Sequence, residues 1–156
     1  MNDSLMPDWI KRIKDEEAAK ASKRELDRQR QIAAEKTLQS DGPEFWKSVM
    51  QELKLASDSL SQIGIRANFS EIGGQGEHGC RIELAAGFPN VNPADVNAFY
   101  RSDHIACYSF GGMDDYSIKL SVNHSGQIVG VISTQPLSAP QIAQKILEPL
   151  VAAVRP

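Results

Sequence analysis

The first third of the chain has the composition of a helix but few apolar positions. Residues 8–39 contain neither Gly nor Pro and consist mainly of Ala, Glu, Lys, Arg, Gln and Leu, which are strong helix formers. Apolar side chains cluster at Trp9, Ile10 and Ile13 and are sparse afterwards, without a heptad seam. A helix that is polar on nearly all sides is solvated or is held at one end. We expect these three apolar residues to mark that end.

A second helix is predicted to begin at Asp41. Gly42 and Pro43 break the helical composition, Asp41 is suited to the N-cap position, and Glu44 has the spacing of a capping-box partner. From Phe45 onward, apolar residues recur at steps of three and four, which indicates an amphipathic helix. Gly64 is placed to end it.

After this helix the apolar period changes from 3.6 to 2, which indicates strands. Turn residues separate the alternating runs, as in an antiparallel meander. The five predicted strands are 65–69, 80–84, 104–110, 116–122 and 127–134. Residues 92–100 fit two interpretations, a short helix with Pro93 in its first turn or an earlier start of the third strand.

The chain closes with another amphipathic helix. Ser138 and Gln141 have capping-box spacing, and the apolar stripe behind them ends at Val154. Pro149 predicts a kink or a loose final turn after Leu147. The predicted fold is therefore α+β, with a long charged N-terminal helix, an amphipathic helix, an antiparallel meander of about five strands and a closing C-terminal helix. The amphipathic and closing helices should share one face of the sheet.

Charge divides the chain into two predicted parts, a helical arm over residues 1–40 and a single α+β domain over residues 41–156. The 156 residues carry a net charge of −3. Residues 11–36 hold nine basic and six acidic groups, whereas residues 41–156 hold eight basic and twelve acidic groups. This distribution argues against nucleic-acid binding, because acidic neighbours compensate much of the arm's positive charge.

The chain shows no apolar run of membrane-spanning length and no basic, apolar start of the signal-peptide type. We therefore expect a cytoplasmic protein that does not bind membranes. In that compartment Cys80 and Cys107 would remain reduced.

A glycine pattern of the dinucleotide-binding type spans Gly74 to Gly79, with Asp95 at the distance expected for a ribose ligand. Phosphate binding requires the last glycine to open a helix, whose N-terminus meets the pyrophosphate. Gly79 precedes an alternating strand instead, so the pattern predicts a flexible hairpin and no nucleotide cofactor.

Four residues of the predicted sheet, His78, Cys80, His104 and Cys107, are of the types that bind zinc. The three-residue separation of His104 and Cys107 places them on opposite faces of a strand, and the spacing typical of structural zinc sites is missing. We expect core cysteines and surface histidines.

Catalytic residues are not predicted either. The chain has no G-x-S-x-G motif, and the carboxylates Asp114 and Asp115 fall in a predicted turn, where Asp is favoured for its local hydrogen bonding. The sequence therefore predicts no enzyme, no metal and no cofactor.

The favoured function is that of a protein-interaction or self-assembly module, with Trp9, Ile10 and Ile13 anchoring the arm on a protein partner or in a homo-oligomer. One alternative is a small-ligand pocket between the sheet and the closing helix. Its polar lining would consist of Tyr100, His104, Tyr108 and Tyr116. A further alternative is a chaperone or adaptor whose acidic body binds a basic partner.

Overall fold

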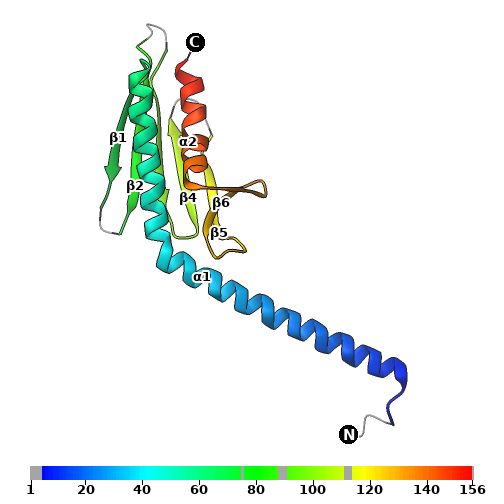
Figure 1. The fold of residues 1–156 in the computed structure, drawn as a ribbon. Helices are drawn as coiled ribbons and strands as arrows, with labels where there is room; N and C mark the ends of the chain where they lie inside the picture. Colours follow the sequence, from blue (N-terminus) through cyan, green and yellow to red (C-terminus); the bar gives the residue numbers. More distant parts are fainter. Residues whose placement is uncertain (1–4, 75, 88–90, 111–113, 156) are drawn as a thin grey trace. The chain divides into compact units, whose positions relative to one another are not determined.

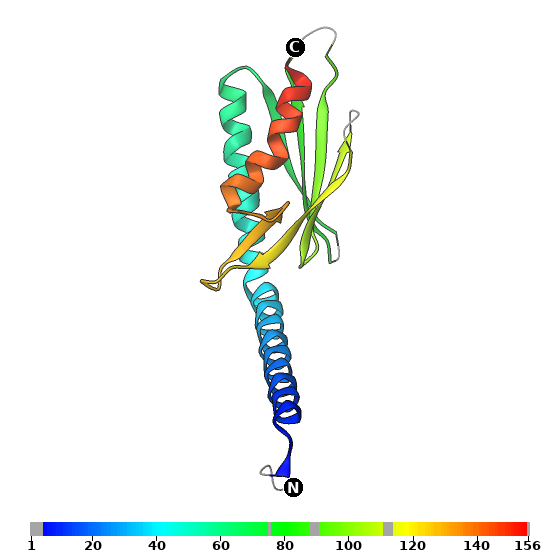
Figure 2. The ribbon, with the colours of Figure 1, turned by 90° about the vertical axis from the view of Figure 1, so that its right-hand side faces the viewer.

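The computed structural model of the chain describes residues 5–74, 76–87, 91–110 and 114–155 (Figures 1 and 2). Its elements are α1 (Asp8–Gln62), β1 (Arg66–Ile72), β2 (His78–Ala85), β3 (Ala94–Tyr100), β4 (His104–Phe110), β5 (Tyr116–Val122), β6 (Ile128–Ile132), β7 (Gln135–Leu137) and α2 (Ala139–Val154). This confirms the predicted α+β class with a long N-terminal helix, a meander and a closing helix. The chain divides into two compact units, residues 1–36 and 37–156, and α1 contributes to both.

Within the first unit, α1 buries almost nothing. Every residue from 12 to 33 is exposed. Two ion pairs of i,i+3 spacing lie along this stretch, Glu17 with Lys20 at 3.5 Å and Glu25 with Arg28 at 2.8 Å. Exposed pairs of this kind contribute only a few tenths of a kcal/mol, about 0.2–0.5 each on a helix surface. Helix propensity is therefore the main local support for this part of α1.

The predicted helix start at Asp41 is wrong, because α1 continues through residues 41–44 to Gln62. Pro43 lies inside the helix, and Gly42 before it has no Cβ to clash with the proline ring. Gly42 is buried against Tyr100, and a Cβ added there would lie 2.0 Å from the Tyr100 hydroxyl oxygen. The glycine thus permits a close helix–sheet contact and does not end the helix.

Burial on the following turns holds α1 in place after Pro43. Trp46, Val49 and Leu53 are almost completely buried, at 2%, 0% and 0% exposure. Burying large side chains of this kind contributes roughly 1.5–3 kcal/mol each, enough to offset the hydrogen bond that the proline removes. The predicted end of the amphipathic helix is confirmed, since α1 stops at Gln62 and Gly64 adopts a φ of +90°.

The sheet has seven strands in the order β1-β2-β3-β4-β5-β6-β7, and all neighbouring strands are antiparallel. Two strands were not among the five predicted. The ambiguous segment 92–100 contains β3, whose residues Ala94, Val96 and Ala98 are buried at every second position, as in a strand with one covered face. The other is β7, only three residues long, which follows β6 after two residues of positive φ, Ser133 and Thr134.

Both helices of the second unit cover the same face of the sheet, as predicted (Figures 1 and 2). The core lies between them and the sheet. It includes Leu53 from α1, Ile82 from β2, Ile105 from β4, Ile118 from β5 and Ile146 from α2. Helix α2 packs closely on β6 at Gly130. A Cβ added to this glycine would lie 2.7 Å from Cδ1 of Ile142 in α2.

Helix α2 begins with the predicted capping box. The side chain of Ser138 accepts from the backbone N–H of Gln141, and the Gln141 side chain accepts from the backbone N–H of Ser138. The helix does not loosen after Leu147 but continues through Pro149 to Val154. Leu150 and Val154 are completely buried, and this packing holds the last turn. Among the helices described, none is long and apolar enough to cross a membrane.

Candidate functional site

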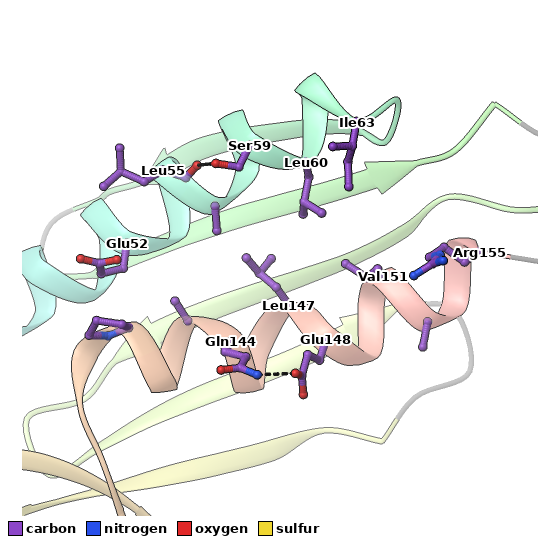
Figure 3. Close-up of a pocket in the computed structure, with 14 residues that line it drawn as sticks. Glu52, Leu55, Ser59, Leu60, Ile63, Gln144, Leu147, Glu148, Val151 and Arg155 are labelled. Carbon is purple, nitrogen blue, oxygen red and sulfur yellow. Dashed lines mark hydrogen bonds between the residues drawn. The ribbon is translucent and has the colours of Figure 1, made fainter.

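An apolar groove lies between the C-terminal part of α1 and α2 (Figure 3). It has a volume of about 810 Å³. Ala56 and Leu60 line it from α1, and Leu147 and Val151 line it from α2. The most exposed apolar residues along it are Leu55, with 53% of its surface exposed, and Ile63, with 73%. The groove therefore presents large apolar side chains to solvent.

The groove exists because both helices carry more apolar residues than the sheet can cover. On α2, Ile142, Ile146 and Leu150 are completely buried. Leu147 and Val151 follow Ile146 and Leu150 by one position, so their side chains are rotated by about 100° around the helix axis, toward the groove. An amphipathic stripe wider than its contact with the sheet leaves part of its width open.

The charged residues of the groove are separated along its length. Figure 3 shows Glu52 at one end and Arg155 at the other. Between them on α2, the Nε2 group of Gln144 donates a hydrogen bond to Oε1 of Glu148 (Figure 3). The groove is thus acidic at the end near the start of α2 and basic at the end of α2.

The predicted anchor residues of the arm are found at the start of α1. Trp9 is 62% exposed and Ile13 is 50% exposed, while Ile10 is half-buried. Leu26 and Ile32, further along the arm, are exposed too, at 47% and 42%. The first two turns of α1 therefore hold the densest apolar cluster of the arm.

The four residues predicted to line a ligand pocket divide between the two faces of the sheet. Directly paired residues share a face, and Tyr116 pairs with Cys107, whereas His104 pairs with Lys119. By this register Tyr100 and Tyr116 are on the helix-covered face, and His104 and Tyr108 are on the opposite face. The four side chains cannot therefore line one cavity, and none of them lines the groove.

On the covered face, each tyrosine is part of the packing. The Tyr100 ring stacks on Trp46, with ring centroids 6.1 Å apart and an interplanar angle of 15°. Burial raises the pKa of the Tyr100 hydroxyl. Burial also raises the pKa of Tyr116, and the neighbouring Cys107 adds to this effect. Both phenols are therefore held in the neutral form.

On the opposite face, the predicted residues have other neighbours. His104 Nδ1 lies 2.6 Å from Oδ1 of Asp103, and this contact lowers the pKa of the Asp103 carboxyl. Tyr108 packs edge-on against Phe99, with ring centroids 5.9 Å apart. Each side chain is held by a separate local contact.

The two cysteines do not form a reactive or metal-binding pair. Cys80 and Cys107 both pair with Ala98, from the strands on either side of it, so they lie two strand spacings apart, roughly 9–10 Å. This exceeds the reach of a disulfide. Burial raises the pKa of both thiols to about 12. In the parts of the chain that the structure describes, no group of three or more His, Cys, Asp or Glu residues is arranged to hold a metal ion.

The glycine pattern forms a hairpin connection, as predicted. β1 and β2 on either side of it pair as antiparallel strands, and Gly79 lies in β2, not at the start of a helix. Gly76 adopts a φ of +80°, which suits a tight turn. Residue 75 of the pattern lies outside the described residues, as do residues 111–113 of the predicted turn before Asp114.

The groove was not among the predicted sites. Its signal in the sequence is the width of the two apolar stripes, since Leu55 falls outside the regular spacing that defines the buried face of α1. The width of the two apolar stripes does not by itself predict that their uncovered edges, one on α1 and one on α2, lie side by side. That information comes from the parallel placement of the two helices on one sheet (Figure 3).

We compared the chain with protein-family models, curated proteins and solved structures, and none of the three comparisons found a match.

Proposed function

We propose that this protein is a non-catalytic protein-interaction or self-assembly module that uses its N-terminal helix as an arm. In this proposal Trp9, Ile10 and Ile13 anchor the arm on a protein partner or on another copy of the chain. The observation that carries the proposal is the exposure of Trp9 and Ile13, at 62% and 50%, in the part of α1 where large apolar residues are otherwise sparse. Large apolar residues that gather at an exposed site favour protein contacts.

The chemistry of this segment also favours a protein partner. Trp9 is preceded by Asp8 and followed by Lys11 and Arg12, so the apolar cluster is flanked by charges of both signs. Tryptophan supplies a large contact area and a single N–H donor, and it is enriched among the residues that dominate binding energy. Flanking charges steer association and select the partner's orientation more than they add affinity.

The test compares two pairs of substitutions in the full chain, Trp9→Ser with Ile13→Ser and the matched control Leu26→Ser with Ile32→Ser. Both pairs remove exposed apolar surface from the arm. We expect proteins that co-purify with the chain from its native cell, or assembly into species larger than a dimer in sedimentation velocity, to be lost with the first pair and kept with the second. If neither pair changes co-purification or assembly, the arm is not the interaction site.

A further inference from the structure

We propose that the groove between α1 and α2 is a dimerisation surface, occupied by the same groove of a second copy of this chain. In the dimer the two grooves face each other in antiparallel orientation about a two-fold axis. The C-terminal part of α1 and α2 of one copy then pack face to face with those of the other copy, and a sheet lies on each outer side. This surface lies within residues 37–156, so it extends the proposed function without depending on the arm.

The apolar content of the groove requires a cover. Leu55 and Ile63 are large side chains at 53% and 73% exposure, and they lie beside the half-buried Val151, whereas Leu147 at the floor of the groove is already buried at 4% exposure. A two-fold interface needs only one patch, because the same surface serves both copies. Leu55, Ile63 and Val151 would be covered in both copies of such a dimer.

The charges of the groove make it complementary to itself in one orientation. Glu52 and Arg155 are at opposite ends, and Glu148, which accepts from Gln144, lies between them (Figure 3). In an antiparallel pair, Arg155 of each copy meets the end of the other groove that holds Glu52. In a parallel pair, Glu52 would meet Glu52 and Arg155 would meet Arg155. Like charges placed opposite each other weaken association and select against that orientation.

The helix dipoles favour the same orientation. The C-terminal part of α1 and α2 run in the same direction, so their C-terminal ends lie at the same end of the groove (Figure 3). Arg155 is the C-cap residue of α2 and offsets the negative end of that helix, whereas α1 has no basic residue in its last turn. An antiparallel dimer brings the C-terminal end of α1 in each copy to the end of the groove where α2 of the other copy begins, so the uncompensated helix end meets a positive one.

The first experiment measures the mass of the full chain by sedimentation velocity over a range of concentrations. We expect a dimer for the wild type and a monomer for the variant with Leu55→Glu and Ile63→Glu. Both positions are exposed, so circular dichroism and thermal unfolding should show that the variant is folded. A wild type that stays monomeric at every concentration would overturn the proposal, as would a variant that still dimerises.

The arm variant separates this proposal from the preceding one. With Trp9→Ser and Ile13→Ser, we expect the dimer to persist while arm-dependent co-purification is lost. If these substitutions abolish the dimer and the groove substitutions do not, assembly occurs through the arm. In that case the proposed function stands and the groove proposal falls.

A charge exchange tests the orientation. Glu52→Arg or Arg155→Glu alone should raise the dimer dissociation constant about tenfold, because in a symmetric dimer each change removes both copies of the pair and creates two repulsive contacts. The two changes combined restore opposite charges and should recover the wild-type constant within about threefold. Equal weakening by the single and combined variants would contradict the antiparallel pairing.

Cross-linking gives an independent measurement of the orientation. A chain with Glu52→Cys is mixed with a chain with Arg155→Cys and treated with a short bismaleimide. The native thiols of Cys80 and Cys107 are buried, at 0% and 1% exposure, and add no background. We expect a cross-linked dimer from the mixture and little from either variant alone. Efficient cross-linking of the Glu52→Cys chain to itself would overturn the antiparallel arrangement.

Discussion

The two parts of α1 share one backbone conformation but have different physical support. In residues 37–62, Trp46, Val49 and Leu53 are buried against the core of the second unit. In residues 12–33, every residue is exposed to solvent and none belongs to the core. The first stretch is held by tertiary packing, and the second is held by helix propensity and exposed ion pairs. The same helical conformation can therefore be supported by tertiary packing in one segment and by helix propensity in another.

The contrast also separates stability from function. A side chain buried in the second unit stabilises the fold but cannot contact a partner. An exposed side chain of the arm can contact a partner, and replacing it should change the free energy of unfolding little. The following substitutions test this division, beginning with the one that should have the largest effect.

Leu53→Ala should lower the free energy of unfolding by about 3 kcal/mol, because Leu53 is completely buried and its removal leaves a cavity in the core. The matched control is the same substitution at Leu26, which is 47% exposed and should change the free energy by no more than about 0.5 kcal/mol. Urea unfolding followed by tryptophan fluorescence measures both. If the two variants lost similar amounts of unfolding free energy, packing would support the arm as much as it supports the second unit.

Gly42→Ala should lower the free energy of unfolding by about 1–2 kcal/mol, since the new methyl group overlaps the Tyr100 hydroxyl. Removing the hydroxyl with Tyr100→Phe should relieve most of this cost, because Ala is otherwise better than Gly in a helix by about 1 kcal/mol. A double-mutant cycle in urea measures the coupling. Additive effects of the two substitutions would contradict the close contact.

Ala21→Gly should weaken the arm helix locally by about 1 kcal/mol and leave the unfolding midpoint of the second unit unchanged. Residue 21 is exposed and its helix does not rest on packing there. Hydrogen exchange should speed up at amides near residue 21. The matched substitution Ala56→Gly, in the packed part of α1, should shift the unfolding midpoint itself. A midpoint shift with Ala21→Gly would mean that the arm is coupled to the second unit.

The smallest effect concerns the Glu25–Arg28 pair. Its hydrogen bond lowers the pKa of the Glu25 carboxyl below the usual 4.5. A lowered pKa in the helix means that the pair supports the helix above pH 4.5 and that this support is lost as the pH falls through the lowered value. Titration of the carboxyl carbon by NMR measures the shift. In Arg28→Gln, the Glu25 pKa should return toward its usual value.

Much of the second unit follows from local rules in the sequence. The buried face of α1, the alternation of β5 and the capping box of Ser138 each depend on residues close together in the chain. Fold class was therefore predictable. The end of α1 at Gly64 was predictable for the same reason, since a glycine in the left-handed region ends helices locally.

The missed features depend on contacts between distant residues. Gly42 and Pro43 have the local signature of a break, and only the close approach of Tyr100, far away in the sequence, explains the glycine inside the helix. The division of the four predicted pocket residues depends on strand register, because Tyr116 faces the helices through its pairing with Cys107. The groove likewise depends on two helices that meet only in the folded chain.

The order of the strands bears on how the chain folds as it is synthesised. Each strand pairs with the one that precedes it in the sequence. A nascent chain can therefore extend the sheet strand by strand without waiting for a distant partner, and such local pairing favours rapid folding. The exception is α2, which follows all seven strands in the sequence and whose Ile142 and Ile146 complete the core. Until α2 has been synthesised, part of the sheet's apolar face stays uncovered, and transiently exposed apolar surface of this kind promotes aggregation.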